Sequence, residues 1–291
     1  MRIASLFLAA VVQLTFAAPT SRAEDAPSKQ PLVMVVMDPL AKPLSCPCVA
    51  GYAQRDYDEL GTALGKSLGR EVKVVFNESL SGAKKKQNLA KVDLVIGKQS
   101  VILHDAKATG FQLEKIAMLT GKDGLTTQRG LLVVPATDSA MSLEDLKDYR
   151  IYFGPQECDE KHAAAMGLLK SRGVAIPTKI ETAVACDEGA IHILKLAEKG
   201  EHGCAVISSY AKPLLEGCGQ VPKGSLRVIG ETEEIPFIAA YVDSTAAPAD
   251  RAAIRENLLK STRDVRLRLA LETKRGFVPV DAAADDVAKK K

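Results

Sequence analysis

The cysteines are the residues whose type and spacing point most directly to chemistry. A thiol can form a disulfide, bind a soft metal ion or take part in redox exchange. Six cysteines in 291 residues are too few for a small disulfide-built scaffold, so each needs a local explanation. Four lie in loops that follow expected strands, and two flank one short segment. The first group is Cys46, Cys48, Cys158 and Cys186, and the second is Cys204 and Cys218.

Three interpretations of the first group stay open. The thiols could pair as disulfides, with Cys46 or Cys48 bonded within its own lobe or Cys158 bonded to Cys186. They could coordinate copper or zinc together with His162. Redox exchange is the third, although Cys46-Pro47-Cys48 has one residue between the sulfurs rather than two. We favour disulfides, and we also expect one between Cys204 and Cys218.

Two similar runs of strands and helices position these loops. The first has apolar strands at 32–37, 72–76 and 92–96 with helices at 57–68 and 83–89 between them. The second has strands at 131–134, 151–153, 204–207 and 226–229, helices at 161–171 and 188–199, and a capping box at Ser142 and Asp145. Two more helices are expected in 248–275. This order predicts an α/β fold of two lobes with parallel sheets. Lobe 1 comprises 31–131 and 236–280, lobe 2 comprises 132–235, and 281–291 is a disordered tail.

The N-terminus predicts export. Arg2 precedes an apolar run from Ile3 to Ala18, and Ser21-Arg22-Ala23 has small residues at the −3 and −1 positions of a cleavage site. Residues 1–23 therefore read as a secretory signal peptide, and the protein is expected in the periplasm. A retained membrane anchor is the alternative, but the apolar run is short for a bilayer span of about 20 residues.

Composition and motifs exclude other classes. The 39 basic and 36 acidic residues give a net charge of only +3, which does not suit a nucleic-acid partner. The sequence has no Gly-x-Ser-x-Gly, no His-Glu-x-x-His and no phosphate-cradling glycine loop, so no catalytic site is expected.

A cleft between the lobes is the expected binding site, because ligands of open parallel sheets lie beyond the carboxyl ends of the strands. His162 also begins a helix there, and helix N-termini favour anions. The polar residues of the loops that follow these strands are the candidate ligand contacts: Asp38, Tyr52, Lys98, Gln99, Ser100, Gln156, Asp159, His162 and Asp187.

The order of these segments carries a family resemblance. The motifs are Tyr57-x-x-Leu60-x-x-x-Leu64, the run 92–97, the run 142–147, Phe153-Gly154 followed by His162, and the run 203–210. In this order the chain resembles the phosphate/phosphonate-type solute-binding proteins of ABC importers, a branch of the type II periplasmic-binding fold. The resemblance implies ligand capture by lobe closure, no catalysis, and a membrane permease as partner, and we expect a monomer.

The ligand does not follow from the resemblance. The phosphonate-binding branch has Ser, Thr and Gly ahead of the position of His162, whereas here the loop 155–161 has three carboxylates and no hydroxyl side chain. We therefore expect a small molecule or ion other than phosphate or phosphonate, and no cofactor unless the cysteines bind a metal. A metal-binding or accessory protein of an exported redox enzyme stays open as the alternative function.

Overall fold

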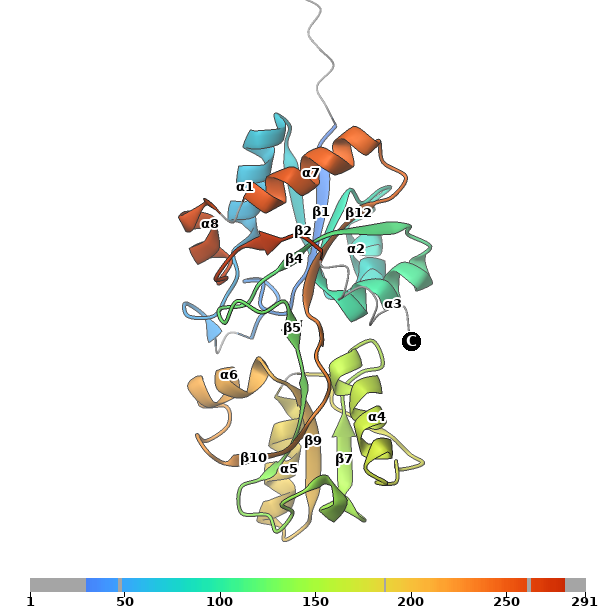
Figure 1. The fold of residues 1–291 in the computed structure, drawn as a ribbon, viewed down its shortest axis with the longest axis vertical. Helices are drawn as coiled ribbons and strands as arrows, with labels where there is room; N and C mark the ends of the chain where they lie inside the picture. The colour runs from blue at the N-terminus through green and yellow to red at the C-terminus, as the bar shows by residue number, and fades with distance from the viewer. Residues whose placement is uncertain (1–29, 47–48, 186, 261–262, 281–291) are drawn as a thin grey trace, which may run out of the picture.

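The computed structural model describes residues 30–46, 49–185, 187–260 and 263–280, and it has two lobes joined by a pair of strands (Figure 1). Each lobe is a β-sheet with helices on both faces. This confirms the expected two-lobed α/β class. The expected signal peptide, the expected tail, Cys48 and Cys186 lie outside the described residues.

The sheet of lobe 1 has six strands in the order β13-β4-β12-β3-β1-β2. Their bounds are β1 Leu32–Met37, β2 Val72–Phe76, β3 Leu94–Lys98, β4 Leu113–Leu119, β12 Ile238–Asp243 and β13 Phe277–Val278. Alternate residues of β1 pack on opposite faces. Met34 contacts the cluster of α1 (Tyr57–Leu68) and α7 (Pro248–Lys260), and Val35 contacts that of α2 (Leu80–Gln87) and α3 (Gln99–Thr109). The short α8 (Val265–Ala270) lies beside α1.

The sheet of lobe 2 has five strands in the order β10-β6-β9-β7-β8. Their bounds are β6 Gly130–Pro135, β7 Arg150–Phe153, β8 Glu181–Thr182, β9 Gly203–Ser208 and β10 Leu226–Glu231. One face is covered by α5 (Glu188–Glu198) and α6 (Ala211–Gly217), and the other by α4 (Ala163–Ser171) and the 3-10 turn η2 (Leu143–Leu146). The expected capping box of Ser142 and Asp145 begins η2.

The two lobes are connected by β5 (Thr127–Gln128) and β11 (Ile235–Pro236), which pair antiparallel. Both strands run between the lobes in Figure 1. The chain passes from lobe 1 to lobe 2 through β5 and returns through β11. Two crossing strands are the only paired backbone connection among the described residues, so the lobes have a narrow hinge.

Both sheets are mixed, which corrects the expectation of purely parallel sheets. β1 runs parallel to β2 and β3, but β12 runs antiparallel to β3 and β4. In lobe 2, β7 runs parallel to β8 and β9, and β6 runs antiparallel to β9. The hinge explains this pattern. A strand that enters a lobe from the hinge must run away from the cleft, whereas β3 and β9 run toward it.

The expected disulfide between Cys204 and Cys218 is wrong, because both are free thiols. Cys204 lies in β9 and is buried in the apolar cluster on the α4 face of the sheet. Cys218 follows α6, which covers the opposite face, and its thiol lies 3.6 Å from the carbonyl oxygen of Leu215. The alternation of side chains along β9 therefore directs Cys204 away from Cys218.

The described part of the chain contains no helix that could cross a membrane.

Gly97 allows β1 and β3 to approach closely. A Cβ at this position would lie 2.7 Å from the backbone carbon of Met37. We expect Gly97→Ala to destabilise the protein by about 1–3 kcal/mol, since a backbone neighbour cannot move aside as a side chain can. Urea unfolding followed by circular dichroism measures the change.

Gly167→Ala is the matched control. Gly167 is exposed within α4, and a Cβ added there would have no neighbour within 4 Å, so alanine should stabilise this helix by about 0.5–1 kcal/mol. Equal stability of the two variants would contradict the close-approach argument.

Candidate functional site

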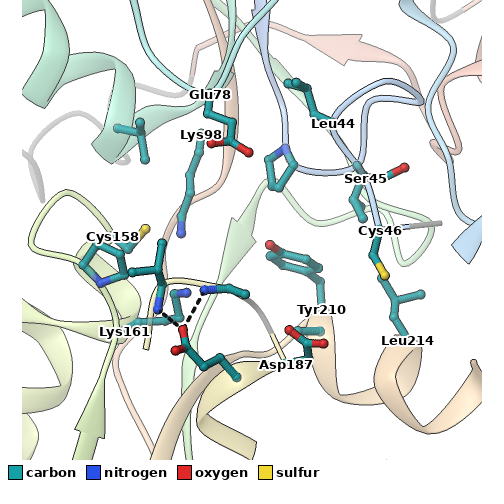
Figure 2. A pocket seen from close by; sticks show the side chains of 18 of the residues that line it. Leu44, Ser45, Cys46, Glu78, Lys98, Cys158, Lys161, Asp187, Tyr210 and Leu214 are labelled. Atoms are coloured by element: carbon teal, nitrogen blue, oxygen red, sulfur yellow. Dashed lines mark hydrogen bonds between the residues drawn. The ribbon is translucent and has the colours of Figure 1, made fainter. Parts of the chain in front are cut away.

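A cavity of about 690 Å³ lies between the lobes, a volume that suits a small molecule. Lobe 1 lines it with the loop after β1, the end of β3 and the start of α3. Lobe 2 lines it with the loop after β7, with Val184, Ala185, Asp187 and Glu188, and with α6. Side chains from both lobes therefore face the same space, as Figure 2 shows.

A buried ion pair crosses between the lobes beside this cavity. Lys98, the last residue of β3, donates from Nζ to Oε1 of Glu160 in the 3-10 turn η3 (Asp159–Lys161) of lobe 2. Ser208 Oγ donates to the same Glu160 oxygen at 2.6 Å. Glu160 is fully buried, and its Oε2 has no hydrogen-bond partner among the described residues. The pair therefore joins β3, η3 and the end of β9 in one charged contact.

Gly130 makes room for this contact. It begins β6, and a Cβ there would lie 2.0 Å from the carbonyl oxygen of Glu160. Any side chain at position 130 would therefore displace η3. The backbone of η3 therefore packs directly against Gly130, the first residue of β6.

The ion pair shifts both ionisation equilibria toward the charged forms. Burial by itself would raise the pKa of Glu160, but the charge of Lys98 and the hydrogen bonds from Lys98 and Ser208 lower it below its usual value. Burial would likewise lower the pKa of Lys98, and the Glu160 charge raises it instead. The pair is therefore ionised at neutral pH.

The two sides of the cavity differ in chemistry. Lys98, Cys158 and Lys161 gather on one side in Figure 2. Leu44 and Leu214 lie on the other side, and Tyr210 projects into the space between. The Tyr210 ring stacks on Phe237 with a centroid distance of 4.9 Å and an interplanar angle of 20°. Lysine side chains thus lie on one side of the cavity and leucine side chains on the other, and the carboxylates Glu78, Glu157, Asp187 and Glu188 line it as well.

Two further contacts hold the lobes together around the cavity. Tyr52 of lobe 1 donates its hydroxyl to the carbonyl of Leu214 in α6 at 3.1 Å. The Asp159 amide of lobe 2 donates to Ser100 Oγ of lobe 1 at 3.4 Å. With the Lys98 pair, these contacts show the lobes in a closed arrangement.

Of the nine predicted ligand contacts, all within the described residues, Lys98 and Asp187 line the cavity. Tyr52, Ser100 and Asp159 make or flank inter-lobe contacts instead. Gln156 is exposed outside the cavity wall, and Gln99 is buried, where it accepts a hydrogen bond from Lys115 at 3.2 Å.

Asp38 and His162 serve their own lobes rather than the cavity. Asp38 is fully buried and accepts from Arg55 at 2.8 Å, from the Tyr57 hydroxyl at 2.5 Å and from the Leu40 amide at 2.8 Å. Its carboxylate therefore anchors the loop that carries the lobe 1 wall. His162 Nδ1 lies 2.8 Å from the Gly154 carbonyl oxygen, which holds the ring within its own loop.

Cys46 and Cys158 both line the cavity, one from each lobe, and they lie on opposite sides of it in Figure 2. Cys158 is a free thiol. Burial raises the pKa of Cys158, and the nearby Lys98 charge only partly opposes this effect. No cluster of three or more His, Cys, Asp or Glu residues that could hold a metal occurs within the described ranges. Metal coordination and disulfide pairing that involve Cys48 or Cys186 stay predictions.

Several cavity residues were missed by sequence reasoning, chief among them Lys161 and Tyr210. Lys161 lies in a loop with three carboxylates, so the local sequence does not indicate that this lysine is buried. Tyr210 ends the motif 203–210 that contributes to the family resemblance, but its stacking partner Phe237 lies between β11 and β12, where the chain returns to lobe 1. Long-range contacts of this kind leave no sequence signal.

Solved structures of two-lobed binding proteins share this architecture. A binding protein component of an ABC phosphonate transporter from Pseudomonas aeruginosa superposes with a TM-score of 0.66 at 15% identity, covering 90% of this chain and 85% of that one. PhnD1 from Prochlorococcus marinus, in complex with methylphosphonate, gives 0.66 at 13% identity with 89% and 96% covered. XAC2383 from Xanthomonas citri, bound to ATP, gives 0.65 at 16% identity with 89% and 94% covered.

The fold is therefore that of the type II periplasmic binding proteins, with a cavity between two lobes. A family model described as "ABC transporter, phosphonate, periplasmic substrate-binding protein" matches residues 51–286. The chain belongs to this family, as the motifs predicted. No curated protein sequence matches the chain.

The Lys98–Glu160 pair predicts a specific stability change. Lys98→Met should destabilise the protein by about 3–5 kcal/mol, because it leaves the buried Glu160 charge uncompensated. The double variant Lys98→Met/Glu160→Met should recover most of this loss, because it leaves no charge behind. Urea unfolding at neutral pH measures both. A single variant as stable as the double variant would contradict the ion pair.

The same pair predicts a pH dependence. The folded-state pKa of Glu160 is lowered, so its contribution is present above the unfolded pKa of about 4.3 and is lost as the pH falls through the folded value. The folded-state pKa of Lys98 is raised, so its contribution is present below the unfolded pKa of about 10.4 and is lost as the pH rises further. The thermal unfolding temperature should thus fall less steeply toward acid in the double variant than in the unaltered protein. Parallel curves would contradict this assignment.

Proposed function

We propose that this protein is an exported substrate-binding protein that captures a small molecule in the inter-lobe cavity and presents it to an ABC-type permease. The single observation that carries the proposal is a cavity of about 690 Å³ walled by both lobes. Membership of the transporter family supports the permease as partner. The N-terminal sequence supports export to the periplasm, and we propose a monomer.

The hinge supports capture by closure. Because β5 and β11 are short and carry the only paired backbone connection among the described residues, the lobes can rotate with little change to either sheet. Opening must break the Lys98–Glu160 pair and the contacts of Tyr52 and Ser100. A ligand that contacts both walls stabilises the closed arrangement over the open one, and this differential affinity is what drives closure.

Binding without chemical conversion fits the cavity better than catalysis does. Its thiol Cys158 has a raised pKa and is thus a poor nucleophile at neutral pH. His162 faces its own loop rather than the cavity. We therefore propose that the ligand leaves the protein unchanged.

Native mass spectrometry of the protein recovered from the exported fraction tests the proposal. We expect a folded species heavier than the denatured chain by the mass of one small molecule. Small-angle scattering should then show compaction when the ligand released by unfolding is returned to ligand-free protein. A protein that carries no ligand and shows no compaction with extracts of the exported fraction would overturn the proposal.

A cavity-blocking variant gives a matched comparison. Val184 lines the cavity and is 71% exposed, so Val184→Trp should fold normally and fill the mouth of the cavity. We expect it to lose at least tenfold in ligand affinity. Leu125→Trp is the control, because Leu125 is also exposed but lies outside the cavity wall. Equal affinity in both variants would contradict binding at this site.

A further inference from the structure

Lys161 is a buried cation in the cavity wall for which the described residues supply no partner. It ends η3, only 7% of it is exposed, and it lines the cavity. Its backbone amide and carbonyl are hydrogen-bonded to Cys158 and Gly154, but its ammonium makes no hydrogen bond or ion pair with any described residue. Its Nζ is not a fully buried atom, so an anionic group inside the cavity can reach it.

Gly154 holds the stem of this lysine in place. A Cβ on Gly154 would lie 2.4 Å from Cβ and 2.7 Å from Cε of Lys161, so only glycine leaves room for the stem. The stem is therefore packed against the backbone of the loop after β7. Figure 2 shows Lys161 of lobe 2 and Lys98 of lobe 1 on the same side of the cavity.

We propose that Lys161 binds the anionic group of the ligand, and that the ligand is an organic monoanion with an apolar body. This inference rests on the proposed function and names the ligand class of the same cavity. Lys98 is already paired with Glu160, so Lys161 is the cation of the described lining whose ammonium makes no ion pair with a described residue. One anionic group of the ligand would pair with it.

The carboxylates of the cavity select against a second negative charge. Glu78, Glu157, Asp187 and Glu188 also line the cavity. Oε2 of Glu188 accepts from the Val184 and Ala185 amides at 2.7 and 3.3 Å, which fixes that charge beside these two residues. A dianion would meet these carboxylates with only one free ammonium to offset them.

The opposite wall requires an apolar body. Leu44 and Leu214 lie on this side in Figure 2, and Leu40, Val49 and the ring of Tyr210 also line the cavity. A bare oxyanion at Lys161 would leave this wall facing water inside a cavity of about 690 Å³. An alkyl chain that contacts the wall should bind about three- to fourfold more tightly for each methylene group that it buries.

Calorimetric titration of the full exported protein, freed of ligand by unfolding and refolding, tests this with 1-hexanesulfonate as the probe. Hexan-1-ol carries the same chain without charge, hexyltrimethylammonium carries the opposite charge, and inorganic phosphate is largely dianionic at about pH 8. We expect hexanesulfonate to bind at least tenfold more tightly than each of the other three. Tighter binding of phosphate or of hexyltrimethylammonium would overturn the assignment of a monoanion.

Variants of the lysine test its role directly. Lys161→Met should weaken hexanesulfonate binding at least tenfold, and Lys161→Arg should retain more of the affinity because it keeps the charge. Lys170→Met, on the exposed face of α4, is the control and should bind as the unaltered protein does. Unchanged affinity in Lys161→Met would overturn the proposal. If this variant does not fold, the ranking of the four probes on the unaltered protein decides the ligand class.

The two proposals fail in different ways. If hexanesulfonate does not bind while native mass spectrometry shows a bound small molecule, the monoanion assignment is overturned and substrate binding stands. If neither a ligand nor compaction is found, substrate binding itself is overturned.

Discussion

The buried ion pair between Lys98 and Glu160 is the contact on which the closed structure depends. Its two charges come from different lobes, and neither can stay buried without the other because an unpaired charge in the protein interior is strongly destabilising. The end of β3, the turn η3 and Ser208 at the end of β9 are all placed by this contact. Gly130 lets η3 approach closely enough for it to form. Closing the lobes and desolvating the pair are therefore one event.

The same pair sets the electrostatics of the cavity. By pairing with Lys98, Glu160 leaves Lys161 as the cation of the described wall that makes no ion pair with a described residue. The loop 155–161 has no hydroxyl side chain and has one lysine among three carboxylates. The residues that contact a ligand lie in loops, and the sheets only position these loops. The chemistry of the cavity wall can therefore change while the fold of the family is kept.

The cysteines show how a compositional signal changes once the fold is known. Cys204 and Cys218 flank one segment in the sequence, yet they are directed to opposite faces of a sheet and remain free thiols. Cys46 and Cys158 are distant in sequence, yet they line one cavity. Spacing along the chain predicted the wrong pair because it contains no information about which face of a strand a side chain occupies when the strand's pairing is unknown.

The sequence by itself determined the strands and helices with strong local patterns, including β1, α1 and the Ser142 capping box, and it determined the family. Burial on both faces and helix capping are local effects, so composition and periodicity report them. The strands β4 and β12 were not predicted, and their opposite directions follow from where the chain leaves lobe 1 and re-enters it at the hinge. Only the tertiary structure selected Lys98 and Asp187 from nine candidates and added Lys161 and Tyr210. Whether a polar side chain faces a ligand or a neighbouring loop depends on contacts between residues far apart in the chain, and these form only when the two lobes close.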